Sequence, residues 1–157
     1  MVMNLKVLVL SDSHGRVQTM LDLFSEGSYR AVIFLGDVVR DTETLYNLSG
    51  GVPVYRVKGN CDMLESAPEE QIIDIGGKLI LICHGHRYGV KSGYAGFENA
   101  ALASGVDCAL CGHTHRQFYE KLGDVIIANP GSVASGNYGV LTVENNKIDF
   151  ELRSIYD

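Results

Sequence analysis

Histidine, aspartate and asparagine residues gather in five short glycine-containing segments, and these residues are the ones that could do chemistry. The segments are residues 11–15 (SDSHG), 36–37 (GD), 59–62 (GNCD), 83–86 (CHGH) and 111–115 (CGHTH). They contain all five histidines of the chain: His14, His84, His86, His113 and His115. Carboxylate, imidazole and amide oxygen form a mixed ligand set that suits borderline divalent ions such as Mn²⁺, Fe²⁺, Ni²⁺ or Zn²⁺. The pattern therefore predicts a metal site.

The five segments share one position in the chain, because each follows a short hydrophobic run. The runs cover residues 6–10, 31–35, 54–57, 79–83 and 108–111. Mostly apolar runs of this length are typical of strands covered on both faces. Ligands of open α/β sheets bind outside the carboxyl ends of the strands. We therefore expect the polar segments to meet at one rim.

The ligand candidates are more numerous than one ion needs. Those that follow the runs are Asp12, His14, Asp37, Asn60, His84, His113 and His115. A catalytic ion takes about three or four protein ligands. The surplus predicts two ions that share a carboxylate.

The elements between and after these runs indicate an α/β fold. Two sets of residues recur with helical spacing and predict helices that bury them: Val17, Met20, Leu21 and Phe24, and then Tyr94, Phe97, Ala101 and Leu102. Short strands joined by Gly, Asn and Asp turns are expected at residues 117–122, 125–128, 139–143 and 148–153. This order, α/β first and a β-meander last, fits two facing sheets with helices outside.

Composition and charge limit the class of protein. With 157 residues, three prolines and no repeat, the chain fits a single domain over residues 1–157. Its net charge of −6 argues against non-specific binding to nucleic acid or to anionic membrane, because both need a basic face. The apolar stretch at residues 7–10 is too short for a signal peptide or a membrane span. We expect a cytoplasmic protein with no membrane partner.

The four cysteines are expected to be reduced thiols, because at least two lie in apparent buried strands. Cys108 and Cys111 have the spacing of half a zinc site or of a redox pair, but the chain has no second pair of this kind. We interpret them as strand core.

The five segments, in this order, resemble the motifs of the calcineurin-like metallophosphoesterase superfamily: Asp-x-His, Gly-Asp, Gly-Asn-x-Asp, Gly-His and Gly-His-x-His. The short chain, the Asn60-Cys61-Asp62 variant and the NPGS sequence at residues 129–132 resemble its small branch of YfcE-like phosphodiesterases. The resemblance spans residues 12–132. It implies a four-layer αββα sandwich, in which two mixed β-sheets are flanked by helices.

The same resemblance implies a ligand set. One ion would be held by Asp12, His14, Asp37 and His115, and the other by Asp37, Asn60, His84 and His113, with Asp37 bridging. Two divalent ions per chain are therefore expected, with Mn²⁺ favoured over Ni²⁺, Fe²⁺ or Zn²⁺. The implied reaction is hydrolysis of a small phosphodiester by a hydroxide that bridges the ions.

Residues next to these ligands are expected to act on the substrate. Many relatives have a histidine at the position of Cys61, where it can protonate the leaving oxygen. Because a thiol is a weak donor, we expect poor hydrolysis of alkyl monoesters and better hydrolysis of aryl phosphodiesters. Asn60 and His86 are expected to contact the substrate, although His86 could equally be a surface histidine or the missing acid.

Two further residues are expected to support the site. Asp62 matches the acidic residue that follows the Gly-Asn pair and is expected to orient a neighbouring group. Asn129 is expected either to border the site, where it could bond a ligand or a metal-bound histidine, or simply to belong to a turn.

Alternative functions remain open from the sequence. A scaffold subunit of retromer resembles this family but departs from the full ligand set, so an interaction module of the same fold is the main alternative. The intact ligand positions favour catalysis. A metallo-β-lactamase-like hydrolase would need a His-x-His-x-Asp-His run, which residues 11–15 do not provide, and a structural zinc protein would need paired cysteines. The resemblance also leaves room for a homodimer.

Overall fold

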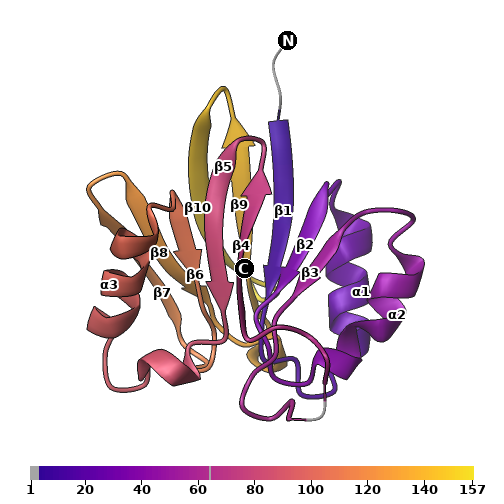
Figure 1. Cartoon of the computed structure of the whole chain (residues 1–157). Coiled ribbons are helices and arrows are strands. Elements are labelled where there is room, and N and C mark those ends of the chain that lie inside the picture. Colours follow the sequence, from indigo (N-terminus) through magenta and orange to yellow (C-terminus); the bar gives the residue numbers. More distant parts are fainter. Residues whose placement is uncertain (1–3, 64) are drawn as a thin grey trace.

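Two five-stranded β-sheets face one another in the computed structural model, which describes residues 4–63 and 65–157 (Figure 1). The first sheet contains, in spatial order, β10 (Lys147–Ser154), β9 (Asn137–Glu144), β1 (Asn4–Leu10), β2 (Ala31–Phe34) and β3 (Val54–Arg56). The second contains β4 (Glu70–Ile75), β5 (Lys78–Cys83), β6 (Cys108–Leu110), β8 (Val125–Pro130) and β7 (Gln117–Leu122). The helices are α1 (Val17–Glu26), α2 (Glu43–Leu48) and α3 (Ala95–Ser104), with short 3₁₀ turns η1 (Val39–Thr42), η2 (His86–Tyr88) and η3 (Val133–Ser135).

Parallel pairing brings several strand ends to one edge of the molecule. In the first sheet β1, β2 and β3 are parallel, and in the second β5, β6 and β8 are parallel. The strands β9 and β10, and the pairs β4–β5 and β7–β8, are antiparallel, so both sheets are mixed. The carboxyl ends of β1 and β5 lie at the lower edge in Figure 1, where the long loops gather.

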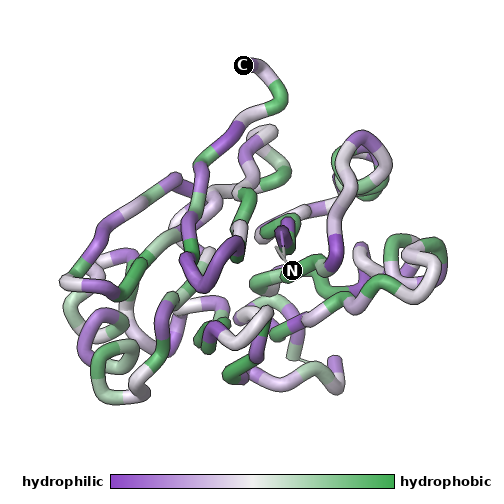
Figure 2. The backbone as a smooth tube through the Cα atoms, turned by 90° about the horizontal axis from the view of Figure 1, so that it is seen from above, coloured by the Kyte–Doolittle hydropathy of each residue, from purple (hydrophilic) through white to green (hydrophobic). Residues whose placement is uncertain are grey.

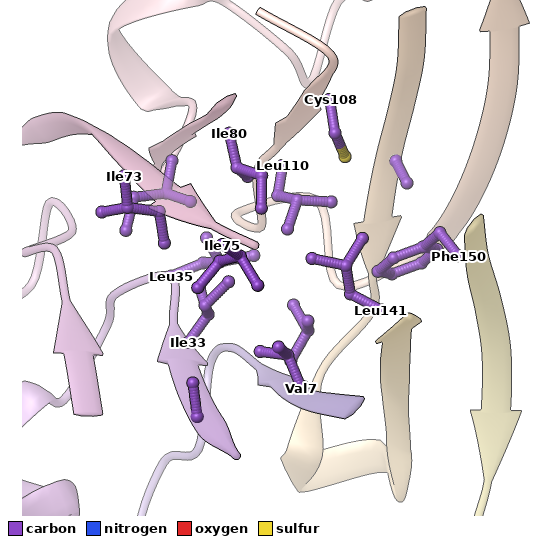
Figure 3. Close-up of a cluster of buried hydrophobic side chains, with 14 of the residues drawn as sticks. Val7, Ile33, Leu35, Ile73, Ile75, Ile80, Cys108, Leu110, Leu141 and Phe150 are labelled. Carbon is purple, nitrogen blue, oxygen red and sulfur yellow. The ribbon is translucent and has the colours of Figure 1, made fainter. Parts of the chain in front are cut away.

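The middle layer is a hydrophobic cluster contributed by both sheets. Val7 and Ile33 from the first sheet point toward Ile80 and Leu110 from the second (Figure 3). Phe150 on β10 closes one side of this layer. Side chains of a strand alternate between its two faces, so the neighbours of these residues face outward.

The outward faces are covered by helices, which completes four layers. Leu8 and Phe34 of the first sheet pack with Met20 of α1 and Leu45 of α2. On the other side of the molecule, the second sheet packs Leu81, Ala109 and Ile127 against Phe97 and Ala101 of α3. Both faces of the central strands are therefore buried, which explains why their sequences are apolar without interruption. The expected αββα sandwich of two mixed sheets is confirmed.

One edge strand was not predicted, whereas the edge strands β3, β7 and β10 match the expected strands at residues 54–57, 117–122 and 148–153 to within one residue at each end. The strand β4 was missed, because its burial alternates and only Ile73 and Ile75 are buried. The expected β-meander in the last third is instead two hairpins in different sheets, β7–β8 in the second and β9–β10 in the first. Along β7, exposed and half-buried residues alternate. Figure 2 shows how hydrophilic and hydrophobic residues are interspersed along the backbone.

The helices differ from expectation in which residues they bury. In α1 the buried residues are Met20 and Leu23, and in α3 they are Phe97 and Ala101. Leu102 is 53% exposed, because α3 turns that position away from the second sheet. The short helix α2 had not been predicted. No helix in the described part of the chain is long and apolar enough to cross a membrane.

The cysteines match the expectation of unpaired thiols. All four are free. Cys108 lies in β6 and Cys111 directly follows it, and both are fully buried, as expected of strand core. Cys61 is exposed.

We predict that truncation of Leu110 destabilises the fold, because its side chain is fully buried between the sheets. Leu110→Ala should lower the free energy of unfolding by about 2–5 kcal/mol. Leu102→Ala on the exposed side of α3 is the matched control and should change it by less than about 0.5 kcal/mol. Chemical denaturation measures both, and equal effects would contradict the assigned middle layer.

Candidate metal centre

Loops from both sheets meet at the shared edge and bring carboxylates and imidazoles together. Asp12 and His14 follow β1, and Asp37 follows β2. From the second sheet, His84 follows β5, and residues 113–115 follow β6. Two groups of potential ligand atoms result, each with its atoms within 4.8 Å of one another: Asp12, His14 and His115, and then Asp37, His84 and His113. Each group takes ligands from both sheets.

The carboxylate of Asp12 has one oxygen satisfied and one oxygen left without a partner. Its Oδ2 accepts hydrogen bonds from Ser11 Oγ and from the backbone N–H of His113. Its Oδ1 is buried and forms no hydrogen bond with any described residue. This Oδ1 lies 3.1 Å from His115 Nε2, 3.8 Å from His84 Nε2 and 4.0 Å from His14 Nε2. It is therefore the oxygen that faces nitrogen atoms of both groups.

The two ring nitrogens of His84 have different surroundings. Its Nδ1 lies 2.7 Å from the carbonyl oxygen of Leu35, and because a carbonyl only accepts, Nδ1 carries the hydrogen. In the neutral ring Nε2 is then a lone pair, yet it lies 3.3 Å from Asp37 Oδ2 and 3.2 Å from His113 Nδ1. A cation, either a proton or a metal ion, must lie among these atoms for the arrangement to be stable. The residues thus fit divalent cations by their chemistry and by an orphaned buried oxygen.

The pKa values of His84, Asp37 and His113 differ from their usual values because these groups lie close together and are partly or fully buried. Burial lowers the pKa of His84, but its hydrogen bond to Asp37 and the charges of Asp12 and Asp37 raise it overall. Burial raises the pKa of Asp37, yet the hydrogen bonds from His84 and from the Cys61 N–H hold it well below its usual range. Burial, together with the charges of His84 and Lys91, lowers the pKa of His113. Asp37 is therefore ionised and His113 is favoured in its neutral, ligand-competent form.

The loops that carry the ligands hold an unusual backbone conformation. Left-handed φ values occur at Asp12 (52°), His14 (40°), Asp37 (62°), Val38 (70°), His113 (71°) and His115 (61°). Such values are uncommon outside glycine, and for a β-branched residue such as Val38 they are strained. Strained residues persist only where the surroundings over-determine them. The site should therefore contain groups that fix these loops.

Asp62 is one of these groups. Its carboxylate is buried and accepts four backbone N–H groups. Oδ2 accepts from Asp37 at 2.8 Å and from Gly59 at 2.9 Å, and Oδ1 accepts from Val38 and Val39, both at 2.9 Å. Asp62 thus ties the loop after β2 to the loop after β3 and holds Asp37 in its left-handed conformation.

Other fixing groups were not predicted from the sequence. Asp41 accepts hydrogen bonds from Ser13 Oγ at 2.8 Å and from the Gly15 N–H at 2.6 Å, which clasps the loop that carries His14. Ser132 donates through Oγ to the carbonyl of Asp12 at 2.7 Å. Asp41 lies in a 3₁₀ turn with no motif spacing, so no sequence signal distinguished it.

Asn129 is fully buried and has its polar atoms engaged inside the protein. Its Nδ2 donates to the carbonyl of Gly112 at 2.8 Å and to Thr114 Oγ1 at 3.0 Å. Its Oδ1 accepts the Gly131 N–H. Asn129 therefore braces the histidine loop after β6, a role that differs from those expected for it.

Gly112 is required by a close approach between that loop and the loop after β1. A Cβ atom at this position would lie 2.0 Å from Ser11 Oγ and 2.7 Å from Asp12 Oδ2. Ser11 Oγ donates a hydrogen bond to Asp12 Oδ2, so any side chain at position 112 would displace the Asp12 carboxylate.

The remaining candidate residues lie at the rim of the centre. Asn60 and Cys61 are exposed, and Cys61 donates its backbone N–H to Asp37 Oδ1 at 3.0 Å. Burial and the charge of Asp37 raise the pKa of the Cys61 thiol. His86 is half-buried on η2, with ring centroids 5.5 Å from His84 and 6.0 Å from His113. Its buried Nδ1 has no hydrogen-bond partner among the described residues.

We predict that Asp62 acts as a positioning residue for the metal centre. Asp62→Asn replaces two accepting oxygens with one oxygen and one NH₂ group, so two of the four N–H groups lose their partner. The affinity for Mn²⁺, measured by titration calorimetry, should fall about 10–100-fold, and the free energy of unfolding should fall by about 1.5–3 kcal/mol. The matched control is Asp74→Asn near the end of β4, where the single N–H contact, from Gly77, can still be accepted by the remaining amide oxygen. Unchanged Mn²⁺ affinity in Asp62→Asn would refute this role.

Sequence comparison finds relatives that are named metallophosphoesterases or phosphodiesterases. The chain is 31% identical over 150 residues to the probable metallophosphoesterase YsnB of Bacillus subtilis (strain 168), covering 90% of this chain and 86% of that protein. It is 28% identical to the phosphodiesterase YfcE of Escherichia coli (strain K12), covering 87% of each.

Solved structures show the same fold. A predicted phosphoesterase from Streptococcus pneumoniae TIGR4 superposes with a TM-score of 0.82 at 22% identity, covering 97% of this chain and 90% of that one. Vps29 of Entamoeba histolytica, solved in complex with Zn²⁺, superposes with a TM-score of 0.74 at 22% identity, covering 96% of this chain and 99% of that one.

A model of a whole protein family also matches the chain. The model of the calcineurin-like phosphoesterase superfamily domain matches residues 5–146, which include all four loops that carry the two ligand groups. The resemblance inferred from the five segments is confirmed. The chain belongs to the calcineurin-like phosphoesterase superfamily.

Proposed function

We propose that the protein is a phosphodiesterase that uses two divalent ions, with Mn²⁺ favoured, to hydrolyse a small phosphodiester. The observation that carries this proposal is the buried, unpartnered Asp12 Oδ1, which faces three imidazole nitrogens. A buried carboxylate oxygen without a hydrogen-bond partner is stabilised by positive charge close to it. Relatives with phosphodiesterase in their names support the reaction class.

Each group would hold one ion. Asp12, His14 and His115 form one set of ligands, and Asp37, His84 and His113 form the other. Asp37 and Asn60 would complete the coordination, with Asp37 shared. When bound, the ions supply an activated water and positive charge at the phosphoryl oxygens. In the reaction, a P–O bond to the water oxygen forms, the P–O bond to one arm breaks, and a proton goes to the leaving oxygen.

The protein's own residues prepare this reaction. Asp62, Asp41 and Asn129 fix the loops, so the ligands need little rearrangement when substrate arrives. The rim residues Cys61 and His86 lie where a leaving arm would pass. A raised thiol pKa makes Cys61 a poor proton donor, which favours leaving groups that need no protonation, such as aryl oxides.

A non-catalytic scaffold is the second candidate. The fold similarity to Vps29, one structure of which holds Zn²⁺, shows that a protein of this fold can bind metal whether or not it is an enzyme. A protein that binds two ions and hydrolyses no phosphoester would support the scaffold.

We predict that Asp37→Ala abolishes metal-dependent turnover. The assay is hydrolysis of bis(p-nitrophenyl) phosphate with Mn²⁺, Ni²⁺, Zn²⁺ and Mg²⁺ in turn. Loss of a ligand to the ions should lower kcat/KM by more than about 100-fold, beyond what loss of an outer contact causes. The control Asp74→Ala changes an exposed carboxylate near the end of β4 and should leave turnover intact. Full activity of Asp37→Ala would end the proposal.

We predict that Cys61→His raises phosphomonoester hydrolysis. An imidazole at this rim position can give a proton to the leaving oxygen, whereas the thiol cannot do so readily. The rate on an alkyl monoester such as glycerol phosphate, followed as released phosphate, should rise by up to about 10²-fold, the lower end of the range for a positioned general acid. Cys61→Ala is the control and should show no such rise. If monoester hydrolysis does not increase in Cys61→His, the thiol is not what limits the activity.

A further inference from the structure

A cavity of about 610 Å³ lies against the histidine loop of the metal centre, on the side of the second sheet. Its walls are residues 90–94, Thr114 and residues 116–118, and we call it the arm pocket. A volume of this order holds a small organic group. None of its residues belongs to either ligand group.

The arm pocket is physically joined to the metal centre. Thr114, which lines the pocket, lies between His113 and His115 in the chain. The buried amide of Asn129 donates both to Thr114 Oγ1 at 3.0 Å and to the Tyr94 hydroxyl at 3.3 Å. One side chain therefore fixes the pocket wall and the ligand loop together.

One part of the pocket wall is aromatic. The rings of Tyr94 and Phe118 are stacked, with centroids 3.9 Å apart and planes 7° from parallel. Both residues are half-buried and pack against the core beneath α3. A rigid stacked pair of this kind suits a planar, unsaturated ligand group.

The pocket is also positively charged. Lys91 and Arg116 line it and are exposed, and neither forms an ion pair with any residue that the structure describes. Both cations lie beside the histidine loop, where they attract anions.

A second cavity beside the centre has the opposite character. It measures about 330 Å³ and includes His86, Arg87, Glu69 and Glu70 among its lining residues. Arg87 is ion-paired with Glu69, and Tyr88 donates a hydrogen bond to Glu70. This cavity has no free cation among its described residues, so an anionic group would be repelled from it.

We propose that the arm pocket binds one arm of the phosphodiester substrate, and that this arm carries an aromatic ring and a negative charge of its own, as a nucleoside phosphate does. This inference rests on the proposed phosphodiesterase function. Tyr94 and Phe118 would contact the ring, and Lys91 and Arg116 would contact the second phosphate. The cavity at His86 would take the other, uncharged arm.

The test compares two chromogenic diesters that differ in a single phosphate: the p-nitrophenyl ester of thymidine 5′-phosphate, with and without a 3′-phosphate. The wild-type protein with Mn²⁺ should prefer the 3′-phosphorylated diester about 3- to 10-fold in kcat/KM, the size expected for two exposed charge contacts. In the double variant Lys91→Met/Arg116→Met the preference should disappear. The control Lys147→Met alters an exposed lysine in the β9–β10 hairpin and should keep it.

Two further measurements keep the outcome clear. In wild-type protein the preference should shrink as ionic strength rises, because salt screens exposed charges, and this needs no variant. Binding of thymidine 3′,5′-bisphosphate, followed by calorimetry, should weaken in the double variant by the same factor. Hydrolysis of both diesters with equal kcat/KM would overturn the pocket but leave the phosphodiesterase intact. Hydrolysis of neither diester would overturn the phosphodiesterase, and the bisphosphate titration would then decide the pocket by itself.

Discussion

The surplus of buried hydrogen-bond acceptors at the meeting edge of the two sheets is the constraint on which the rest of the structure depends. Asp12 Oδ1 and His84 Nε2 are both withdrawn from water, and His84 Nε2 lies 3.8 Å from Asp12 Oδ1 and 3.3 Å from Asp37 Oδ2. Burying such atoms without positive charge among them is costly. Positive charge at the centre offsets this cost, and the carboxylates of Asp12 and Asp37 raise the pKa of His84 in the same sense.

Much of the surrounding structure exists to keep these acceptors in place. The ligand loops adopt left-handed conformations that their residues do not favour, and three anchors hold them: Asp62, Asp41 and Asn129. None of the three belongs to either ligand group. Each accepts or donates several hydrogen bonds across loops from different strands, so the strain is spread over the whole edge. The rigidity of the centre is therefore a property of the loops as a set.

The sequence predicted most strands, because their hydropathy is readable locally, but it missed contacts that form across the fold. The apolar runs before Asp12, Asp37 and His84 were readable as strands because burial on both faces leaves no polar interruption. The edge strands β3, β7 and β10 were also predicted, whereas β4, which buries only Ile73 and Ile75, was not. The anchoring role of Asp41 depends on a contact 26 residues away in the chain, which no local pattern reveals. The placement of Lys91 and Arg116 in the wall of one pocket likewise depends on the tertiary fold.

The division of each ligand group between the two sheets has a consequence for how the molecule responds to change. Asp12 and His14 belong to one sheet and His115 to the other, and the second group is split in the same way. A cation held by either group would link the two sheets directly, whereas the middle layer between them consists of hydrophobic side chains. Metal ligation tolerates displacements of only about 0.5 Å, whereas a hydrophobic layer can repack over more. Substitutions far from the loops can shift the spacing of the two sheets slightly. Such shifts would therefore weaken ion binding before they unfold the protein.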